Sequence, residues 1–415
     1  MQFLKPSILV LLLLGSITAP TQGQNRASIK LTVDPATKHF RCRFRLRVQP
    51  DSANSPLVLN LNRHFPVLSV SSPRMNGFSQ RPYLYPAFQD TLLGLHFSYP
   101  GSRLRTRRIK LTYEGTLTSR YATDQAMEFS RHTLWLPFLP NQEDAPLDYS
   151  LQARVPNGYS VVSTRPATGK FRYRGRTAAI EPTVLVSKQF RSLDSGPAIP
   201  RIEVVKTSPL LATDTLLLAE TKRIVGFYNQ GLGRRDAITT FKILLPGTNR
   251  DAFGLLDNAV DITYSDFDVR KPGDRLILAH EISHKWWAYG SVSNADEWLN
   301  EGFAVYSSLL YLRATGDTAA FRQQLAVHQQ AAQGAPAIIG LDRHKHDYKT
   351  LRRVIYSKGA TVLAALHGRI GDERFMELLA RTAAQKTATT EALLGLVGQA
   401  TDAETRRWLT TELSR

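Results

Sequence analysis

The sequence predicts an α+β protein in which an N-terminal antiparallel β domain precedes a mixed α/β domain that ends in helices. In residues 24–200, short stretches of alternating apolar and polar side chains recur between turns rich in Pro, Gly, Asn and Ser, which is typical of a β-sandwich or saddle. Beyond Pro200 the pattern changes, and apolar residues recur at helical spacing from Thr213 onwards. We therefore expect a β domain over residues 24–200 and a second domain over residues 201–415.

The first 23 residues have the composition of a secretory signal peptide. Lys5 precedes an apolar run, and small and polar residues follow it as far as Gly23. An uncleaved membrane anchor is the alternative, but the apolar stretch from Ile8 to Ala19 is only twelve residues long, and a spanning helix needs about twenty. We expect cleavage before Gln24 and a secreted, periplasmic or extracellular mature chain without a transmembrane segment.

The chain is strongly basic. Its formal net charge is +18, and loss of Lys5 with the leader would leave +17. Such a charge favours polyanions, anionic membrane surfaces or acidic substrates as partners. In Arg41-Cys42-Arg43-Phe44-Arg45, alternation places the arginines on one face of a strand, which a solvated sheet face explains. We find no nucleic-acid-binding motif and predict no nucleic-acid partner, and the sequence indicates no oligomeric state. Cys42 is the only cysteine, so the chain must do without an internal disulfide.

The individual elements follow from local patterns. Alternating runs in the first half include residues 28–33, 57–61 and 109–113. In the second half we expect a helix over 213–228, a strand over 238–245, a helix with Asp274 as N-cap that stops at Gly290, and a helix from residues 294–296 to Gly316. Further helices are expected at about 318–333, 348–369, 372–382, 388–399 and 402–414.

The most informative motif is His280-Glu281-Ile282-Ser283-His284. Two histidines four residues apart on a helix project from one face about one turn apart, which suits two imidazole ligands of one tetrahedral zinc ion. A carboxylate from a second helix would complete the ligand set and leave the fourth position open for water, and Glu301 is the candidate. Glu281 would lie beside the metal. The alternative is an exposed helix with unrelated histidines.

Three further segments accompany this motif in the order found in one protein family. They are Gly254–Asn258 (GLLDN) upstream, and Trp298–Ala304 (WLNEGFA) and Tyr356–Ala360 (YSKGA) downstream. With them, the chain resembles the zinc aminopeptidases of the aminopeptidase N type, the gluzincin family that also includes leukotriene hydrolase. Leu111–Gly115 (LTYEG) and Trp135–Pro137 (WLP) are similar to that family's motifs in its first domain. The resemblance covers nearly all of the mature chain and implies a short, two-domain secreted member whose residues 201–415 form a thermolysin-like zincin domain.

The resemblance implies a role for each site residue. His280, His284 and Glu301 would hold one zinc ion, and Glu281 would act as the general base. Tyr356 would donate a hydrogen bond to the oxyanion, and its alternative role is the packing of a helix face.

The resemblance also implies a place where the substrate binds. Gly254 would lie on an edge strand that an extended peptide can join, since glycine lets the backbone come close to it. Asp257 would meet the free α-amine of the substrate, and Asn258 is a further candidate for substrate binding. An ordinary turn also explains Leu256-Asp257-Asn258.

Two departures from the family pattern bear on function. Sixteen residues separate His284 from Glu301, whereas the family usually has eighteen, and we interpret the loss as a trimmed turn between Gly290 and Trp298. Asp257 stands where the family has glutamate, and its shorter side chain weakens the case for strict aminopeptidase action. The chain ends at Arg415 without the helical domains that enclose the cavity in larger relatives, so we expect an open site that accepts longer peptides or a protein end.

We therefore predict a zinc metallopeptidase that hydrolyses peptide bonds, most simply as an aminopeptidase acting on the N-terminus of a peptide or protein. One alternative is a zincin endopeptidase or hydrolase without an amine anchor. Another is a binding protein that kept the fold and lost turnover, although the complete set of ligands and base argues against it.

Overall fold

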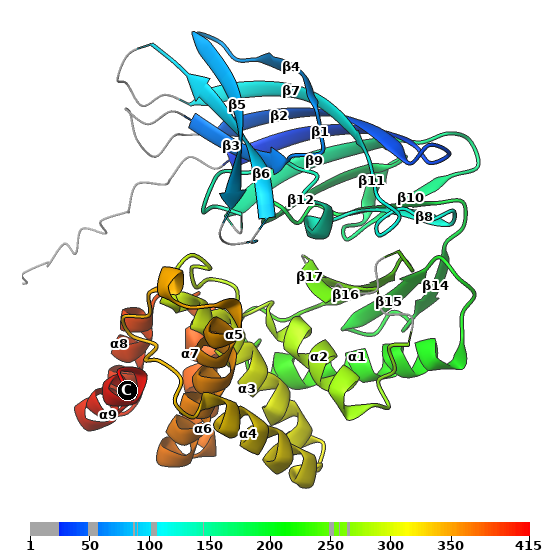
Figure 1. Ribbon diagram of the computed structural model, residues 1–415. Helices are drawn as coiled ribbons and strands as arrows, with labels where there is room; N and C mark the ends of the chain where they lie inside the picture. The colour runs from blue at the N-terminus through cyan, green and yellow to red at the C-terminus, as the bar shows by residue number, and fades with distance from the viewer. Residues whose placement is uncertain are drawn as a thin grey trace, which may run out of the picture.

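The chain was analysed as a computed structural model, shown in Figure 1. It describes residues 25–48, 57–85, 88, 90–100, 106–143, 145–248, 253–256, 258–263 and 266–415, with the backbone alone for 253–256. The predicted signal peptide and Asp257 lie outside the described residues. The β domain stands above a second domain in which a sheet is flanked by helices (Figure 1).

The β domain is built on a seven-stranded sheet with the order β11-β12-β9-β1-β2-β7-β4, in which only β1 and β9 pair in parallel. Two three-stranded sheets, β3-β6-β5 and β10-β13-β8, accompany it. The strands and the short helix of this domain are β1 (Asn25–Asp34), β2 (His39–Val48), β3 (Leu57–Asn62), β4 (Val67–Ser71), β5 (Gly77–Tyr85), β6 (Asp90–Ser98), β7 (Arg107–Thr116), β8 (Ala126–Phe129), η1 (Arg131–Thr133), β9 (Pro146–Arg154), β10 (Ser160–Ser163), β11 (Ala167–Gly169), β12 (Arg172–Ala178) and β13 (Val184–Ser187).

Strict alternation makes the large sheet two-faced. In β2, Phe40, Cys42 and Phe44 are buried, while the intervening arginines are exposed. The buried side chains of β1, β2 and β7 form one core with those of the two smaller sheets, and Phe40 lies edge-on to Phe65 and Phe129 with ring centroids 4.9 and 5.2 Å apart. The opposite face of the large sheet is solvated.

The second domain begins with a five-stranded sheet of order β14-β15-β16-β18-β17, in which β15, β16 and β18 are parallel and the two edge strands are antiparallel. The predicted boundary at residue 200 lies between β14 and β15. The elements are β14 (Arg191–Asp194), β15 (Arg201–Lys206), α1 (Ala212–Gln230), β16 (Thr240–Leu245), β17 (Phe253–Leu256), β18 (Ala259–Ile262), α2 (Pro272–Ser283), η2 (Ala295–Glu297), α3 (Trp298–Ala314), α4 (Thr318–Ala332), η3 (Arg343–Lys345), α5 (Tyr348–Arg352), η4 (Arg353–Lys358), α6 (Gly359–Ile370), α7 (Asp372–Ala384), α8 (Thr390–Ala400) and α9 (Ala403–Leu413).

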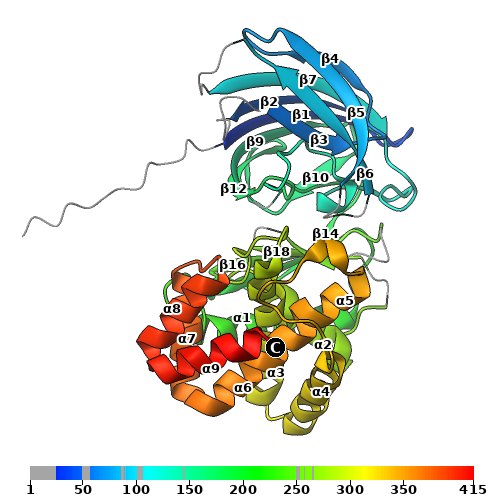
Figure 2. The same cartoon turned by 60° about the vertical axis from the view of Figure 1, so that its left-hand side comes forward.

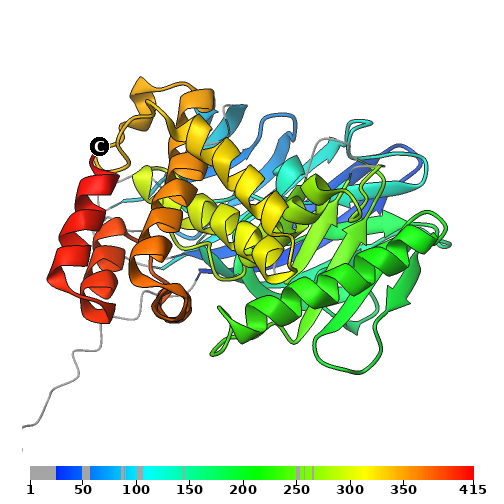
Figure 3. The same ribbon diagram turned by 90° about the horizontal axis from the view of Figure 1, so that it is seen from below.

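The small sheet packs on both of its faces. On one face, Ile202 and Val204 of β15 share a core with Leu217 and Ile224 of α1, the long green helix of Figure 3. On the other face, Val205, Leu244 and Ala259 pack with Leu185 of β13, so the two domains meet there. The helices α7, α8 and α9 gather at one end of the second domain, on the left in Figure 2. Within the described ranges, no helix combines the length and the apolar character that crossing a membrane requires.

Two predicted helix boundaries were wrong. The helix with the histidines begins with Lys271 as N-cap and Pro272 in its first turn, because proline's fixed φ suits that position. Asp274 lies inside the first turn and accepts a hydrogen bond of 2.8 Å from the Asp268 amide. The same helix ends at Ser283 and not at Gly290, because the chain then turns more tightly and buries Trp286 and Trp287.

The predicted continuous helix over 348–369 is in fact three segments. A π-helical turn, η4, separates α5 from α6. Such wide turns inside helices occur frequently at functional sites, and this one contains Tyr356.

Candidate metal centre

Two helices bring the three predicted ligands together. His280 lies in the last turn of α2, His284 is the residue that caps this helix, and Glu301 lies in the first turn of α3. The Nε2 atoms of the two histidines are 3.2 Å apart, and Oε2 of Glu301 lies 3.2 Å and 3.5 Å from them. Ligand atoms about 2.0–2.1 Å from a tetrahedral zinc ion would be separated by about 3.3–3.4 Å. The triangle therefore has the size of three zinc ligands.

The protonation pattern of these atoms also fits a cation. Nδ1 of His284 donates a hydrogen bond of 2.8 Å to the Trp287 carbonyl, which leaves the Nε2 lone pair free for a metal. Oε2 of Glu301 is buried and has no hydrogen-bond partner among the described residues. Burial disfavours a charged imidazole, yet the Glu301 carboxylate raises the pKa of His284 to about 9. The Glu301 carboxylate therefore favours a positive charge beside it, and a zinc ion held by the three residues would supply that charge.

The short connection between the two ligand helices is held closed by a pair of hydrogen bonds. The Gly290 amide donates to Oδ1 of Asn300, and Nδ2 of Asn300 donates to the Gly290 carbonyl, both at 2.8 Å. A side chain on Gly290 would place its Cβ 2.1 Å from the Asp296 carbonyl oxygen, so only glycine fits there. The connection of sixteen residues from His284 to Glu301 is therefore a compact turn, and the ligand triangle is intact.

Glu281 lies on α2 between the two histidines and is partly buried. Burial raises the pKa of its carboxyl group, and the charges of His280 and His284 oppose that shift. A carboxylate with a raised pKa is better matched to accepting a proton near neutral pH. The positive charge of Arg131, in η1, also lowers the pKa of Glu281. The β domain therefore reaches the edge of the site. The sequence did not indicate Arg131, because only the packing of the two domains brings it there.

Tyr356 faces the metal centre from η4. Its ring stacks on that of His280 with an interplanar angle of 8° and centroids 6.2 Å apart, and Cζ of Arg352 lies 4.2 Å from the centre of the tyrosine ring. Burial, followed by the negative charge of Glu301, raises the pKa of Tyr356, so the phenol remains a hydrogen-bond donor at neutral pH. The tyrosine is thus positioned to donate to a group bound at the metal.

His328 is a second residue that the sequence did not indicate. It lies on α4, where Nδ1 is 3.2 Å from Oγ of Ser357, the neighbour of Tyr356. Burial and the charge of His280 lower the pKa of His328, which favours the neutral ring. A single histidine in a glutamine-rich helix gives no sequence signal, so only the structure places it beside the site.

The predicted substrate-binding segment is at the edge of the small sheet. Gly254 lies in β17, which among the described residues pairs only with β18 and forms an edge of the sheet. Asn258 follows with φ = 55°, and its Oδ1 atom is buried without a hydrogen-bond partner in the described part of the chain. Asp257, between them, lies outside the described residues. The functional roles of the site residues stay predictions. This applies to the three ligands, to Glu281 and Tyr356, and to Gly254, Asp257 and Asn258.

Comparison with known proteins identifies the class of the second domain. Residues 260–409 match the model of the Peptidase family M1 domain. A crystal structure of an M1 zinc metallopeptidase from Deinococcus radiodurans has a similar fold over 95% of both chains, with 20% sequence identity and a TM-score of 0.68. A variant of the Deinococcus radiodurans protein bound to a Tyr-Ser-Ala substrate has a TM-score of 0.67 at 20% identity over 95% of both chains. A comparison with curated proteins gave no match.

The chain has the two-domain fold of the Deinococcus radiodurans M1 zinc metallopeptidase. The match of residues 260–409 to the Peptidase family M1 domain, with this shared fold, confirms the resemblance to aminopeptidase N-type gluzincins and the α+β fold class. The match to the Peptidase family M1 domain also confirms two further predictions, namely a hydrolase and a zinc cofactor.

Proposed function

We propose that the chain is a zinc-dependent aminopeptidase that removes residues from the N-terminus of peptides. The observation that carries this proposal is the triangle of His280, His284 and Glu301, whose ligating atoms are 3.2–3.5 Å apart around one point. Glu281 lies between the two histidines on α2, and the Tyr356 ring stacks on that of His280, so a base and an oxyanion donor are both available beside the triangle.

The residues of the chain divide the work of hydrolysis. A zinc ion held by the three ligands would lower the pKa of a water molecule and polarise the scissile carbonyl. The Glu281 carboxylate takes a proton from the attacking water and passes it to the leaving amine, a transfer typically worth about 100-fold to 10,000-fold. The Tyr356 hydroxyl donates a hydrogen bond to the developing oxyanion, and a donor of this kind is worth about 100-fold to 1000-fold.

The edge strand β17 supplies the means of holding the substrate. Because β17 is an edge strand of the sheet that the structure describes, its outer edge can accept an extended peptide through main-chain hydrogen bonds. In our proposal, Asp257 and Asn258 then meet the free α-amine at the end of this strand. The Deinococcus radiodurans structure with Tyr-Ser-Ala supports a peptide substrate for this fold.

Assays on matched peptides with free and acetylated N-termini test the aminopeptidase assignment. A charged hydrogen bond to the amine is worth about 1.5–3 kcal/mol, so acetylation should lower kcat/KM by about 10-fold or more. Asp257→Asn should erase most of that difference, because the size is kept and the charge is removed. Glu281→Gln is the control for background hydrolysis and should be inactive. Equal cleavage of free and acetylated peptides by the unmodified chain would instead establish the endopeptidase alternative.

We also propose that the mature enzyme is exported and begins near Gln24. The charged start, the short apolar run and the small-residue exit of the first 23 residues support this. N-terminal sequencing of the protein from its native host tests the proposal. Recovery of Met1 in a membrane fraction would show an uncleaved anchor in its place.

A further inference from the structure

The solvated face of the seven-stranded sheet is covered with cations. Alternation directs two basic side chains of β1, four of β2, two of β7, one of β9 and three of β12 away from the core, and all of them are exposed. We call this set the basic face. Its members are Arg26, Lys30, Arg41, Arg43, Arg45, Arg47, Arg108, Lys110, Arg154, Arg172, Arg174 and Arg176.

Several of these cations face one another directly. Lys30 is the cross-strand partner of Arg43, Lys110 is the partner of Arg45, and Arg47 lies between Arg26 and Arg108. Like charges opposite one another in a sheet are destabilising. The fold therefore accepts a cost that a hydrogen-bonded anion on this face would offset.

Few carboxylates on the same face compensate these charges. Glu114 pairs with Arg41 at 2.7 Å, and Asp148 lies 4.0 Å from Arg26. Within the part of the chain that the structure describes, no carboxylate lies within ion-pair distance of the other three arginines of β2, namely Arg43, Arg45 and Arg47. The centre of the basic face is thus a row of uncompensated guanidinium groups.

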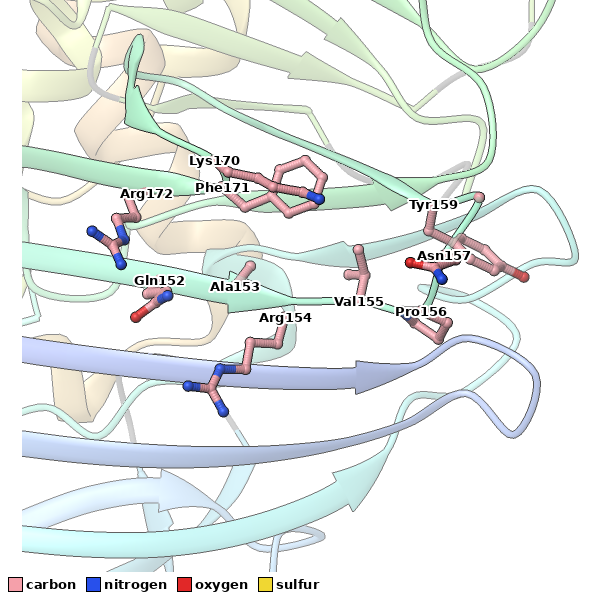
Figure 4. A pocket seen from close by; sticks show the side chains of 11 residues that line it. Gln152, Ala153, Arg154, Val155, Pro156, Asn157, Tyr159, Lys170, Phe171 and Arg172 are labelled. Atoms are coloured by element: carbon pink, nitrogen blue, oxygen red, sulfur yellow. The ribbon is translucent and has the colours of Figure 1, made fainter.

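A hollow of about 490 Å³ adjoins the end of this face (Figure 4). Arg154 and Arg172 belong both to the hollow and to the basic face, and Lys170 adds a third cation. Tyr159 and Phe171 also line it, and none of its lining residues is acidic. The hollow therefore offers aromatic surface and positive charge together.

We propose that the basic face and the adjoining hollow bind an acidic polysaccharide. The guanidinium group of arginine matches carboxylate, sulfate and phosphate groups through paired hydrogen bonds. Along β2 the four arginines recur about every 6.8 Å and span about 20 Å, so an extended chain can meet several of them at once. The flat faces of sugar rings carry C–H groups that pack against aromatic rings such as those of Tyr159 and Phe171.

Two features favour a polysaccharide over a membrane surface. The described side chains between the cations of β1 and β9 are polar, as at Ser28, Thr32 and Gln152, so this part of the face offers little apolar surface to enter lipid. A β-sheet of seven strands is twisted, and a flexible chain follows a twisted surface that a flat bilayer meets only in part. None of the residues of the basic face is a predicted site residue, so binding here would anchor the enzyme and leave its catalytic site open.

Heparin and polygalacturonate serve as sulfated and carboxylated probes for the full mature enzyme. The triple variant Arg43→Gln, Arg45→Gln, Arg47→Gln removes the centre of the face. The matched control, Arg322→Gln, Arg374→Gln, Arg407→Gln, removes the same charge from exposed positions on α4, α7 and α9. We expect the Kd for heparin at 0.1 M salt to rise about 10-fold to 100-fold in the face variant and less than about 2-fold in the control.

Further arms of the experiment separate the outcomes. Arg154→Gln with Arg172→Gln should weaken the binding of short oligosaccharides, because it alters the hollow. Hydrolysis of a small neutral peptide should be unchanged in both triple variants. The melting temperature should not fall in either, and in the face variant it should rise because facing like charges are removed, which excludes misfolding. Equal loss of binding in the two triple variants would overturn the proposal, since net charge alone would then explain it. Face-dependent binding to phosphatidylglycerol vesicles or to duplex DNA, with none to either polysaccharide, would also overturn it.

Discussion

Gly302 of α3 and Gly359 of α6 let two helix backbones touch. A Cβ atom added to Gly302 would lie 3.0 Å from Cα of Gly359 and 3.1 Å from the carbonyl oxygen of Ile355. Gly302 follows the predicted metal ligand Glu301, and Gly359 lies three residues after Tyr356. The contact therefore fixes the distance between the helix that carries Glu301 and the turn that carries the tyrosine.

Substitution of Gly302 by alanine should destabilise the enzyme and displace Tyr356. Both neighbours of the new methyl group are backbone atoms, which cannot rotate away, and overpacking of this kind costs about 1–3 kcal/mol. Thermal unfolding should show a lower melting temperature, and turnover should fall more than metal content.

Gly368→Ala is the matched control, because Gly368 lies in α6 with no atom within 4 Å of an added Cβ. Alanine is favoured over glycine in a helix by about 1 kcal/mol, so this variant should be as stable as the parent or more stable. Equal destabilisation by the two substitutions would show that the close helix contact is not responsible.

Removal of the third ligand should separate metal binding from catalysis. Glu301→Ala takes away one corner of the ligand triangle and should deplete zinc in the purified protein. Glu281→Gln should abolish hydrolysis and retain one zinc ion per chain, because Glu281 is not a ligand. Metal analysis by mass spectrometry on both variants makes the measurement. Stoichiometric zinc in the Glu301 variant would contradict the assigned ligand set.

Tyr356→Phe should affect turnover more than substrate binding. The hydroxyl is proposed to meet the oxyanion, which exists only along the reaction, so kcat should fall by about 100-fold or more with a modest change in KM. Steady-state kinetics on one peptide is sufficient. Unaltered turnover would leave the tyrosine with a packing role against Arg352 and His280.

The proximity of the three predicted ligands could be foreseen from the sequence because their geometry is largely local. Two histidines one helical turn apart must share a face, and the segment around Glu301 indicates the third candidate once the family resemblance is recognised. The end of α2 and the π-helical turn at Tyr356 could not be predicted, because burial of Trp286 and Trp287 and the packing of α3 on α6 decide them. Those are tertiary effects that override local helix preference.

The same limit applies to residues that reach the site from distant elements. Arg131 and His328 lie far from the zinc motif in sequence, and each is a single charged or titratable residue without a motif around it. The basic face shows the opposite case. The alternating arginines of β2 already indicated a solvated sheet face, but only the register of β12, β9, β1, β2 and β7 shows that five strands contribute to one surface.

A buried pair of carboxyl groups joins the two domains. Glu128 of β8 and Asp261 of β18 are both fully buried. Oγ of Ser130 donates to Glu128 at 2.6 Å, Thr248 also donates to it, and Nδ1 of His132 lies 3.5 Å away. The described residues provide neither oxygen of Asp261 with a hydrogen-bond donor. Burial, followed by the charge of Glu128, raises the pKa of Asp261 well above its usual range, so the pair shares one proton.

Asp261→Asn should therefore change how stability depends on pH. A carboxyl group whose pKa is raised by folding contributes stability at acidic pH, and that contribution is lost as pH rises from the unfolded-state pKa to the folded-state pKa, at a rate of about 1.4 kcal/mol per pH unit. The parent enzyme should thus become less stable above the usual aspartate range, whereas asparagine stays neutral, can donate to Glu128 and should flatten the profile. Melting temperatures measured from pH 4 to pH 9 provide the comparison, with Asp124→Asn, on the exposed surface, as the control. Parallel profiles for the parent and the Asp261 variant would mean that Asp261 is already ionised in the folded enzyme and that another cation neutralises it.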